Sequence, residues 1–155
     1  MNKIVSFNNL DNILKRIKSK RKVLVGGCFD LIHYGHFSFL KNSKKQGDYL
    51  IIALESDEFI KKKKGKSSIH NQIQRAKILS GLTFVDLVIL LPYLEKDKEY
   101  FCLVKKINPQ VIAITKGDKQ IKNKKRQAKQ VGAKVKTVVS LLKGLSSSNI
   151  YNLCH

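Results

Sequence analysis

Residues 23–36, VLVGGCFDLIHYGH, decide the fold of this chain: an apolar run ends in two glycines, and an aspartate and two histidines follow. The run has the composition of a buried β-strand, and the glycines mark a turn out of it. His33 and His36 are three residues apart, so a helix beginning here places both on one face, within reach of the same anion. Gly26 and Gly27 let a phosphate approach the backbone, and the first helical turn offers unpaired amide groups. The stretch therefore predicts a strand that leads into a nucleotide phosphate site.

Two simpler interpretations of this stretch stay open. A glycine pair after a strand can serve only the steric needs of a tight strand-to-helix turn. Two histidines at helical spacing can also bind a metal, although no cysteine, histidine or carboxylate pattern nearby completes a ligand set. The phosphate interpretation is specific because strand, GG, FD and HYGH occur together, and we expect no metal held by the protein alone.

The rest of the chain alternates short apolar runs with amphipathic segments, which predicts one α/β domain over residues 1–155. A lead-in over residues 1–20 carries an amphipathic helix at 8–19. The run YLIIAL is almost continuously apolar, as expected in a parallel sheet covered on both faces. We expect a Rossmann-like five-stranded parallel sheet with helices on both faces and ligands beyond the carboxyl ends of the strands. The expected strands are 22–26, 49–54, 86–91, 110–115 and 134–139.

Composition limits the compartment and the partners. No apolar run approaches the roughly 20 residues that span a bilayer, and the N-terminus lacks the apolar block of a secretory signal. Cys28, Cys102 and Cys154 show no pairing pattern, so we expect reduced thiols in a cytoplasmic protein without membrane contact.

The charge is unusual, because 31 basic residues face 11 acidic ones and give a net charge of +20. Such an excess attracts phosphate-rich partners. The basic residues are spread over most of the expected helices and do not alternate with exposed aromatic residues, so we expect no dedicated nucleic-acid site.

The motif GGCFDLIHYGH resembles the signature of the HxGH nucleotidyltransferases, and the resemblance covers nearly the whole chain. It continues in the order of the cytidylyltransferase-like family. The N-terminal KIVSFNNLDNILKRIKSKRKVLV resembles the lead-in of heptose 1-phosphate adenylyltransferase domains, whereas DYLIIALESDEF is equally similar to glycerol 3-phosphate cytidylyltransferases. The matching segments are LKNSKKQGDYLIIALESDEF, KKKKGK, QRAKIL, FVDLVIL, NPQVIAITKGD and GLSSSNI.

This resemblance implies an enzyme that transfers a nucleoside monophosphate from ATP or CTP to a small phosphorylated metabolite and releases pyrophosphate. Heptose 1-phosphate with ATP is the favoured pair, and glycerol 3-phosphate or a related alcohol phosphate with CTP is the alternative. Mg²⁺ would be bound mainly through the triphosphate. Relatives often dimerise, so a homodimer is possible.

The resemblance also assigns roles to individual residues. Catalytic roles fall on His33, His36 and Lys64, the last within a lysine run that we expect on a loop and that would otherwise be solvated surface. Substrate binding falls on Asp30 and Asp57, although Asp30 could instead fix its loop. Nucleotide binding falls on Gly27, Cys28, Phe29, Gly35, Arg75, Gly117, Asp118, Ser146, Ser147 and Ser148.

Plainer roles stay open for three of these positions. Arg75 could form a surface salt bridge, Asp118 could cap a helix, and the serines at 146–148 could be an ordinary N-cap. The chain also departs from its relatives, because Leu141 and Leu145 stand where many of them carry an arginine. Lys143 is the nearby cation that would replace these charges. The missing arginines keep a non-catalytic, basic nucleotide- or RNA-binding module as an alternative of another class.

Overall fold

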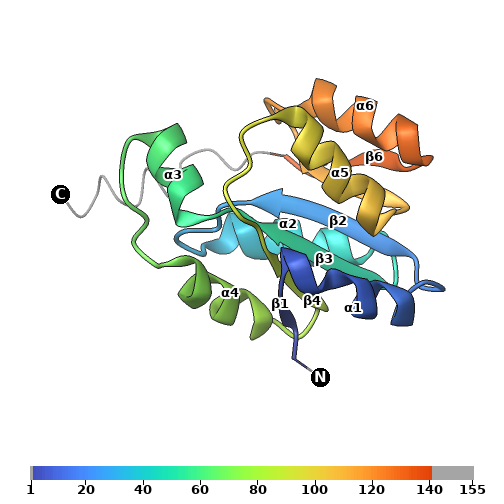
Figure 1. The fold of residues 1–155 in the computed structure, drawn as a ribbon, viewed down its shortest axis with the longest axis horizontal. Helices are drawn as coiled ribbons and strands as arrows, with labels where there is room; N and C mark the ends of the chain where they lie inside the picture. The colour runs from blue at the N-terminus through green and yellow to red at the C-terminus, as the bar shows by residue number, and fades with distance from the viewer. Residues whose placement is uncertain (1, 141–155) are drawn as a thin grey trace.

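The computed structural model describes residues 2–140, so the three serines at 146–148 lie outside the described residues. Within them the chain forms one parallel sheet of six strands in the order β1-β4-β3-β2-β5-β6 (Figure 1). The strands are β1 (Ile4–Ser6), β2 (Lys22–Gly27), β3 (Tyr49–Leu54), β4 (Leu87–Leu90), β5 (Val111–Thr115) and β6 (Lys134–Val139).

The five expected strands are confirmed to within a residue at each end, but a five-stranded sheet is wrong by one strand. The additional strand, β1, pairs with β4 at the edge of the sheet. It has only three residues, too few to show an alternating or continuous apolar pattern in the sequence. The lead-in therefore contains a strand and a helix rather than a helix alone.

Helices cover both faces of the sheet, as expected (Figure 1). The core on one face includes side chains from α1, α5 and α6, and the core on the other includes side chains from α2 and α4. The helices are α1 (Leu10–Arg16), which follows the 3-10 turn η1 (Phe7–Asn9), α2 (Tyr34–Lys44), α3 (Asp57–Lys64), α4 (Gln72–Ser80), α5 (Asp97–Ile107) and α6 (Ile121–Val131).

The lysine run lies on a helix, so the expectation of a loop is wrong. Ser56 caps α3 by accepting a hydrogen bond from the backbone N–H of Phe59 at 3.1 Å, and Gly65 ends the helix with φ 68°. Acidic residues occupy the first turn and lysines the last, an arrangement that suits the helix dipole. In α4, Ala76 and Leu79 are buried, whereas Ile73 and Ile78 are exposed.

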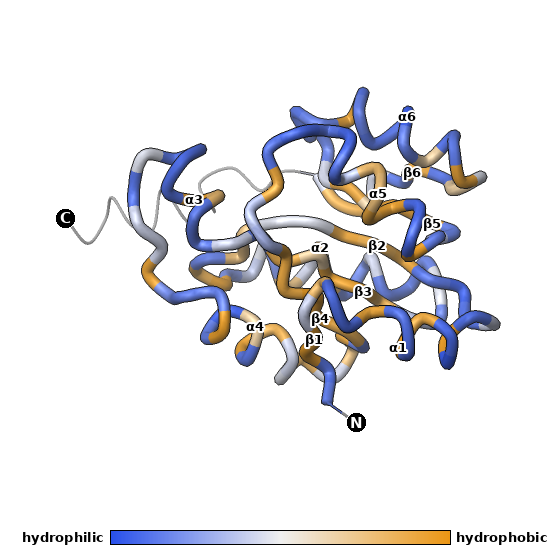
Figure 2. The backbone as a smooth tube through the Cα atoms, in the orientation of Figure 1, coloured by the Kyte–Doolittle hydropathy of each residue, from blue (hydrophilic) through white to orange (hydrophobic). Residues whose placement is uncertain are grey.

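The sheet has an apolar middle and a polar carboxyl edge. All six residues of β3 are buried, and in β2 burial ends where Gly26 begins. Figure 2 shows hydrophobic residues along the central strands and mostly hydrophilic ones along α6. In the sheet, β2 lies between β3 and β5: β3 and β4 extend the sheet on one side of β2, and β5 and β6 extend it on the other. The strand order therefore reverses at β2, beside the loop that follows it, and open α/β sheets bind ligands at such a point.

Candidate active site

The loop after β2 is shaped by Phe29 packing on Gly27. Phe29 is buried with φ 47°, and a Cβ on Gly27 would lie 2.9 Å from the Phe29 ring. Gly27 therefore meets a steric need, and the Phe29 ring belongs to the core, so only backbone atoms of Phe29 remain for the predicted nucleotide contact. Gly26 differs, because the nearest atom to an added Cβ is 3.9 Å away. The backbone at Gly26 is open to an approaching group.

The two histidines are held against each other at the start of α2. His33 is the N-cap residue, and its Nδ1 accepts hydrogen bonds from the backbone N–H groups of Gly35 (3.1 Å) and His36 (3.4 Å). Because Nδ1 accepts, the proton of the neutral ring lies on Nε2, which is then a donor. The His36 ring stacks on His33 with centroids 3.8 Å apart and meets the edge of Phe29 at 5.2 Å. A Cβ on Gly35 would lie 2.9 Å from the His33 ring, so glycine is needed there to keep this geometry.

Both imidazoles are neutral at physiological pH. Burial, the neighbouring His33 and the charge of Lys64 together lower the pKa of His36 to about 4, while the backbone carbonyl of Leu31 acts in the opposite direction. Burial also lowers the pKa of His33. The pair can therefore donate hydrogen bonds to phosphate oxygens without carrying a charge.

Arg75 ties the histidine loop to the segment that precedes α4. Its side chain is fully buried and donates to the backbone carbonyls of Cys28 and His70 and to Asp57, the last at 2.7 Å. Hence the alternative of a surface salt bridge is wrong for Arg75. A nucleotide contact by this residue stays a prediction, because these contacts account for a structural role.

The two aspartates expected to bind substrate are both engaged with the protein. Asp30 is buried and accepts backbone N–H bonds from Ile69 and His70 at 3.0–3.1 Å, so it fixes the loop. Burial opposes ionisation of Asp57, but hydrogen bonds from Arg75 and its other partners outweigh it and lower its pKa. A substrate contact by either aspartate stays a prediction.

The lysines of α3 point to different surroundings. Lys62 bonds Glu58 at 2.9 Å and lies 4.0 Å from the centre of the Tyr93 ring. Lys64, in contrast, is close enough to the histidine loop to act electrostatically on Cys28 and His36. Among the lysines of this helix, Lys64 is thus the one whose charge is felt at His36.

The end of β5 presents Gly117, with φ 81°, and Asp118. Asp118 accepts from the backbone N–H of Gln120 at 2.7 Å and from Nζ of Lys124 at 2.6 Å. It supports the turn into α6, although the N-cap residue itself is Gln120. The nucleotide contacts predicted for Gly117 and Asp118 are compatible with this edge position and stay predictions.

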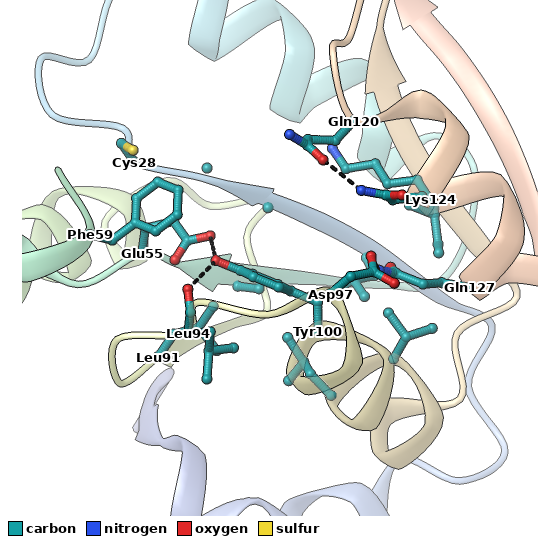
Figure 3. Close-up of a pocket in the computed structure, with 18 of the residues that line it drawn as sticks. Cys28, Glu55, Phe59, Leu91, Leu94, Asp97, Tyr100, Gln120, Lys124 and Gln127 are labelled. Carbon is teal, nitrogen blue, oxygen red and sulfur yellow. Dashed lines mark hydrogen bonds between the residues drawn. The ribbon is translucent and has the colours of Figure 1, made fainter. Parts of the chain in front are cut away.

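A cavity of about 490 Å³ opens beside the histidine loop, between the sheet and helices α5 and α6 (Figure 3). Gly26, Gly27 and Cys28 form one side of it, and Glu55 and Tyr100 contribute polar groups. We did not anticipate these last two residues. The available signal was that Glu55 directly follows the buried run YLIIAL, which places a carboxyl group at the carboxyl end of a central strand.

Two further observations concern the described part of the chain. Residues 2–140 contain no cluster of three or more histidine, cysteine, aspartate or glutamate side chains placed to hold a metal ion. In the same residues, no helix has both the length and the apolar character needed to cross a membrane.

Fold and site together define a class, that of α/β proteins with a glycine loop and a helix start at the carboxyl edge of a parallel sheet, the place where such sheets bind phosphate groups. Residues 24–152 match the family model described as cytidylyltransferase-like. The chain therefore belongs to the cytidylyltransferase-like family, as the resemblance of its motifs implied.

Two curated relatives with different names match this chain over most of its length. The chain is 36% identical over 158 residues to the bifunctional protein HldE of Helicobacter hepaticus, a match that covers 96% of this chain and 29% of the relative. It is 38% identical over 120 residues to the FAD synthase of Pyrococcus horikoshii, covering 77% of this chain and 79% of that enzyme. The chain thus spans less than a third of the HldE protein but most of the length of the FAD synthase.

Solved structures agree on the fold. A lipopolysaccharide core biosynthesis protein from Thermoplasma volcanium superposes with a TM-score of 0.64 at 27% identity, covering 80% of this chain and 98% of that one. Pantothenate synthetase from Thermus thermophilus superposes with a TM-score of 0.70 at 15% identity, covering 97% of this chain and 67% of that one. At this low identity the second match concerns the fold alone.

Proposed function

We propose that this chain transfers the adenylyl group of ATP to a heptose 1-phosphate-type sugar phosphate and releases pyrophosphate. The observation that carries the proposal is the pair of neutral, stacked imidazoles at the start of α2, with the charge of Lys64 acting on His36. The acceptor is supported by the HldE relative, whose match extends over 96% of the chain, and by the resemblance of residues 3–25 to heptose 1-phosphate adenylyltransferase lead-ins.

In the proposed reaction an oxygen of the acceptor phosphate attacks the α-phosphorus of ATP in line. The bond from that phosphorus to the bridging oxygen breaks, and pyrophosphate leaves with the electron pair. The attacking phosphate is already ionised at neutral pH, so no general base and no covalent intermediate are needed. Catalysis is then a matter of positioning and of stabilising charge on the departing oxygens.

Each site residue has a definite task in this scheme. Nε2–H of His33 and the ring of His36 would donate to the α and β phosphates, and Lys64 would neutralise the pyrophosphate. Ser146, Ser147 and Ser148 would bind the β and γ phosphates with hydroxyl and amide groups. Mg²⁺, when bound, would neutralise triphosphate oxygens and be held mainly by them.

A second candidate acceptor has a specific observation in its favour. The FAD synthase of Pyrococcus horikoshii is matched over 79% of its length, which makes a flavin phosphate the main competitor of the sugar phosphate. The CTP-dependent use of glycerol 3-phosphate stays an alternative through the resemblance of residues 48–59. Leu141 and Leu145, in place of the arginines of many relatives, favour the non-catalytic binding module.

Pyrophosphate release separates these possibilities. The purified chain would be assayed with ATP and with CTP, each combined with heptose 1-phosphate, glycerol 3-phosphate and FMN. We expect the highest kcat/KM with ATP and heptose 1-phosphate. Faster turnover of FMN would reassign the acceptor, and triphosphate binding without turnover on any acceptor would favour the binding module. Salt-sensitive RNA binding that is indifferent to triphosphate would contradict an enzyme.

A further inference from the structure

Glu55 is a buried carboxyl group beside the histidine loop. It is 8% exposed, it follows the last residue of β3, and its backbone N–H donates to the carbonyl of Gly27 at 3.1 Å. That bond fixes the residue next to the glycines of the proposed phosphate site. Its side chain lines the cavity described above (Figure 3).

One oxygen of this carboxyl group has a partner and the other has none. Oε1 lies 2.9 Å from the hydroxyl of Tyr100, which also lies 3.3 Å from the carbonyl of Leu94. Oε2 is buried and meets no hydrogen-bond donor among the described residues. A buried acceptor without a donor destabilises the protein, so a group that supplies the missing donor binds with advantage. The terminal torsion of glutamate is soft, which lets either oxygen take the Tyr100 bond while the other turns to the cavity.

The other polar groups of the lining that come from α5 and α6 are already paired with protein. Asp97 accepts from Arg126 and from Gln127 at 2.8 Å. Lys124 is paired with Asp118, and the side-chain amide of Asn123 donates to Gln120 at 2.9 Å. Much of the remaining wall is apolar and comes from Leu94, Leu103, Val104 and Ile112. Within the described lining, Glu55 is therefore the buried carboxylate with an uncommitted oxygen.

We propose that this cavity receives the carbon skeleton of the acceptor and that Glu55 accepts a hydrogen bond from one of its hydroxyl groups. Tyr100 is the positioning residue, because its hydroxyl holds one carboxyl oxygen in place. The site then selects a polyhydroxylated phosphate over one with an unsubstituted apolar or cationic body. This inference rests on the proposed nucleotidyl transfer and names the substrate class that the transfer uses.

A hydroxyl group fits this carboxyl in either protonation state. Burial raises the pKa of Glu55 to about 7, while the Tyr100 hydrogen bond and the charges of Arg75 and Lys124 act in the opposite direction. The ionised group accepts from a hydroxyl, and the protonated group still offers a carbonyl-type oxygen or donates to the hydroxyl oxygen. An ammonium group, in contrast, would find its counter-charge only in the ionised form.

The test measures binding of the acceptor without chemistry. Titration calorimetry on the full chain, saturated with a non-hydrolysable ATP analogue and Mg²⁺, would compare heptose 1-phosphate with cyclohexyl phosphate, a ring without free hydroxyls. We expect wild type to bind the sugar phosphate about 10- to 100-fold more tightly, the range of one hydrogen bond to a charged group. Glu55→Met, which keeps the volume and removes the acceptor, should lose most of this preference. Its affinity for the ATP analogue should stay within twofold of wild type.

Glu95→Gln is the matched control, because Glu95 is an exposed carboxylate on the rim of the same cavity. It should change the preference less than twofold. Equal affinity of wild type for both phosphates would overturn the proposal, and this arm needs no variant to fold. An undiminished preference in Glu55→Met would also overturn it. Binding with the expected preference but no pyrophosphate release on any acceptor would leave the cavity assignment standing and refute the transferase activity instead.

Discussion

His36 is the residue whose surroundings fix its chemistry most completely. Its ring is enclosed by His33 and Phe29, and burial keeps it neutral, so it acts as an aligned donor rather than a charge. His36→Ala should lower kcat for pyrophosphate release by about 10²–10³-fold, as expected for loss of one transition-state donor. Steady-state kinetics with ATP and the best acceptor would measure the loss.

Tyr34 supplies the control for this substitution, because it lies in the same first turn of α2 with its side chain 67% exposed. Tyr34→Ala should keep kcat within about twofold, since exposed positions without specific contacts tolerate substitution. Circular dichroism of both variants would establish that α2 is intact. A His36→Ala enzyme with wild-type kcat would remove this histidine from the mechanism.

Arg75 supports the site without touching the reacting atoms. Removing the guanidinium in Arg75→Leu leaves the carbonyls of Cys28 and His70 without this donor and Asp57 without its cation. The expected loss in the free energy of unfolding is about 3–5 kcal/mol, as for breaking a buried charge pair from one side. Urea unfolding would measure it. Arg126→Leu, which removes a 62% exposed arginine paired with Asp97, should cost about 1 kcal/mol or less. Similar losses in both variants would contradict the structural role of Arg75.

At the scale of elements, the helical turn of α3 places neighbouring lysines of the run in different surroundings. Lys64 acts on His36, whereas Lys62 is occupied by Glu58 and Tyr93. Lys64→Ala should reduce kcat/KM for ATP about 10- to 100-fold, the range expected for one charge-assisted phosphate contact. Lys62→Ala should reduce it less than about threefold, which makes the comparison independent of net charge. A larger loss in Lys62→Ala would mean that the lysine that binds phosphate lies on the face of α3 that carries Lys62, and not on the face that carries Lys64.

The same element shows what the sequence predicts and what it does not. Buried strands such as β3 are apolar throughout, so their positions follow from the residues alone. The capping serine and Gly65 around α3 were also present in the sequence, but four consecutive lysines hid the helix because they show no apolar period. The expected carboxyl edge, with the histidine loop beside Lys64, follows from the motifs.

The burial of single polar residues could not be predicted, because it depends on contacts between segments far apart in the chain. Arg75 is fully buried only because the loop at Cys28 and the turn at His70 meet around it. Glu55 is buried because Tyr100 of α5, 45 residues later, packs over it. Neither contact leaves a local pattern in the sequence. The phosphate contacts predicted for Ser146, Ser147 and Ser148 concern residues outside the described part of the chain and stay predictions.

At the scale of the whole molecule, two buried groups give folding stability opposite dependences on pH. The pKa of His36 is about 4 in the folded chain against 6.5 ordinarily, so its contribution is present above pH 6.5 and is lost as the pH falls toward 4. The pKa of Glu55 is about 7 against 4.5, so its contribution is present below pH 4.5 and is lost as the pH rises through 7. Between pH 5 and 7.5 the two effects largely cancel in the wild-type chain.

Single substitutions should reveal these two pH dependences of the free energy of unfolding, because the changes they cause have opposite signs. From pH 7.5 to pH 5, the free energy of unfolding of His36→Gln should rise relative to wild type by about 2 kcal/mol, because a neutral side chain escapes the cost of protonating a buried imidazole. Over the same interval Glu55→Gln should fall relative to wild type by about 2 kcal/mol, since its advantage exists only where the carboxylate would be ionised. Urea unfolding at five pH values would measure both. Parallel pH profiles for the two variants would mean that burial does not shift the pKa values of His36 and Glu55 in opposite directions. The neutral imidazole pair on which the phosphate site depends would then have to be abandoned.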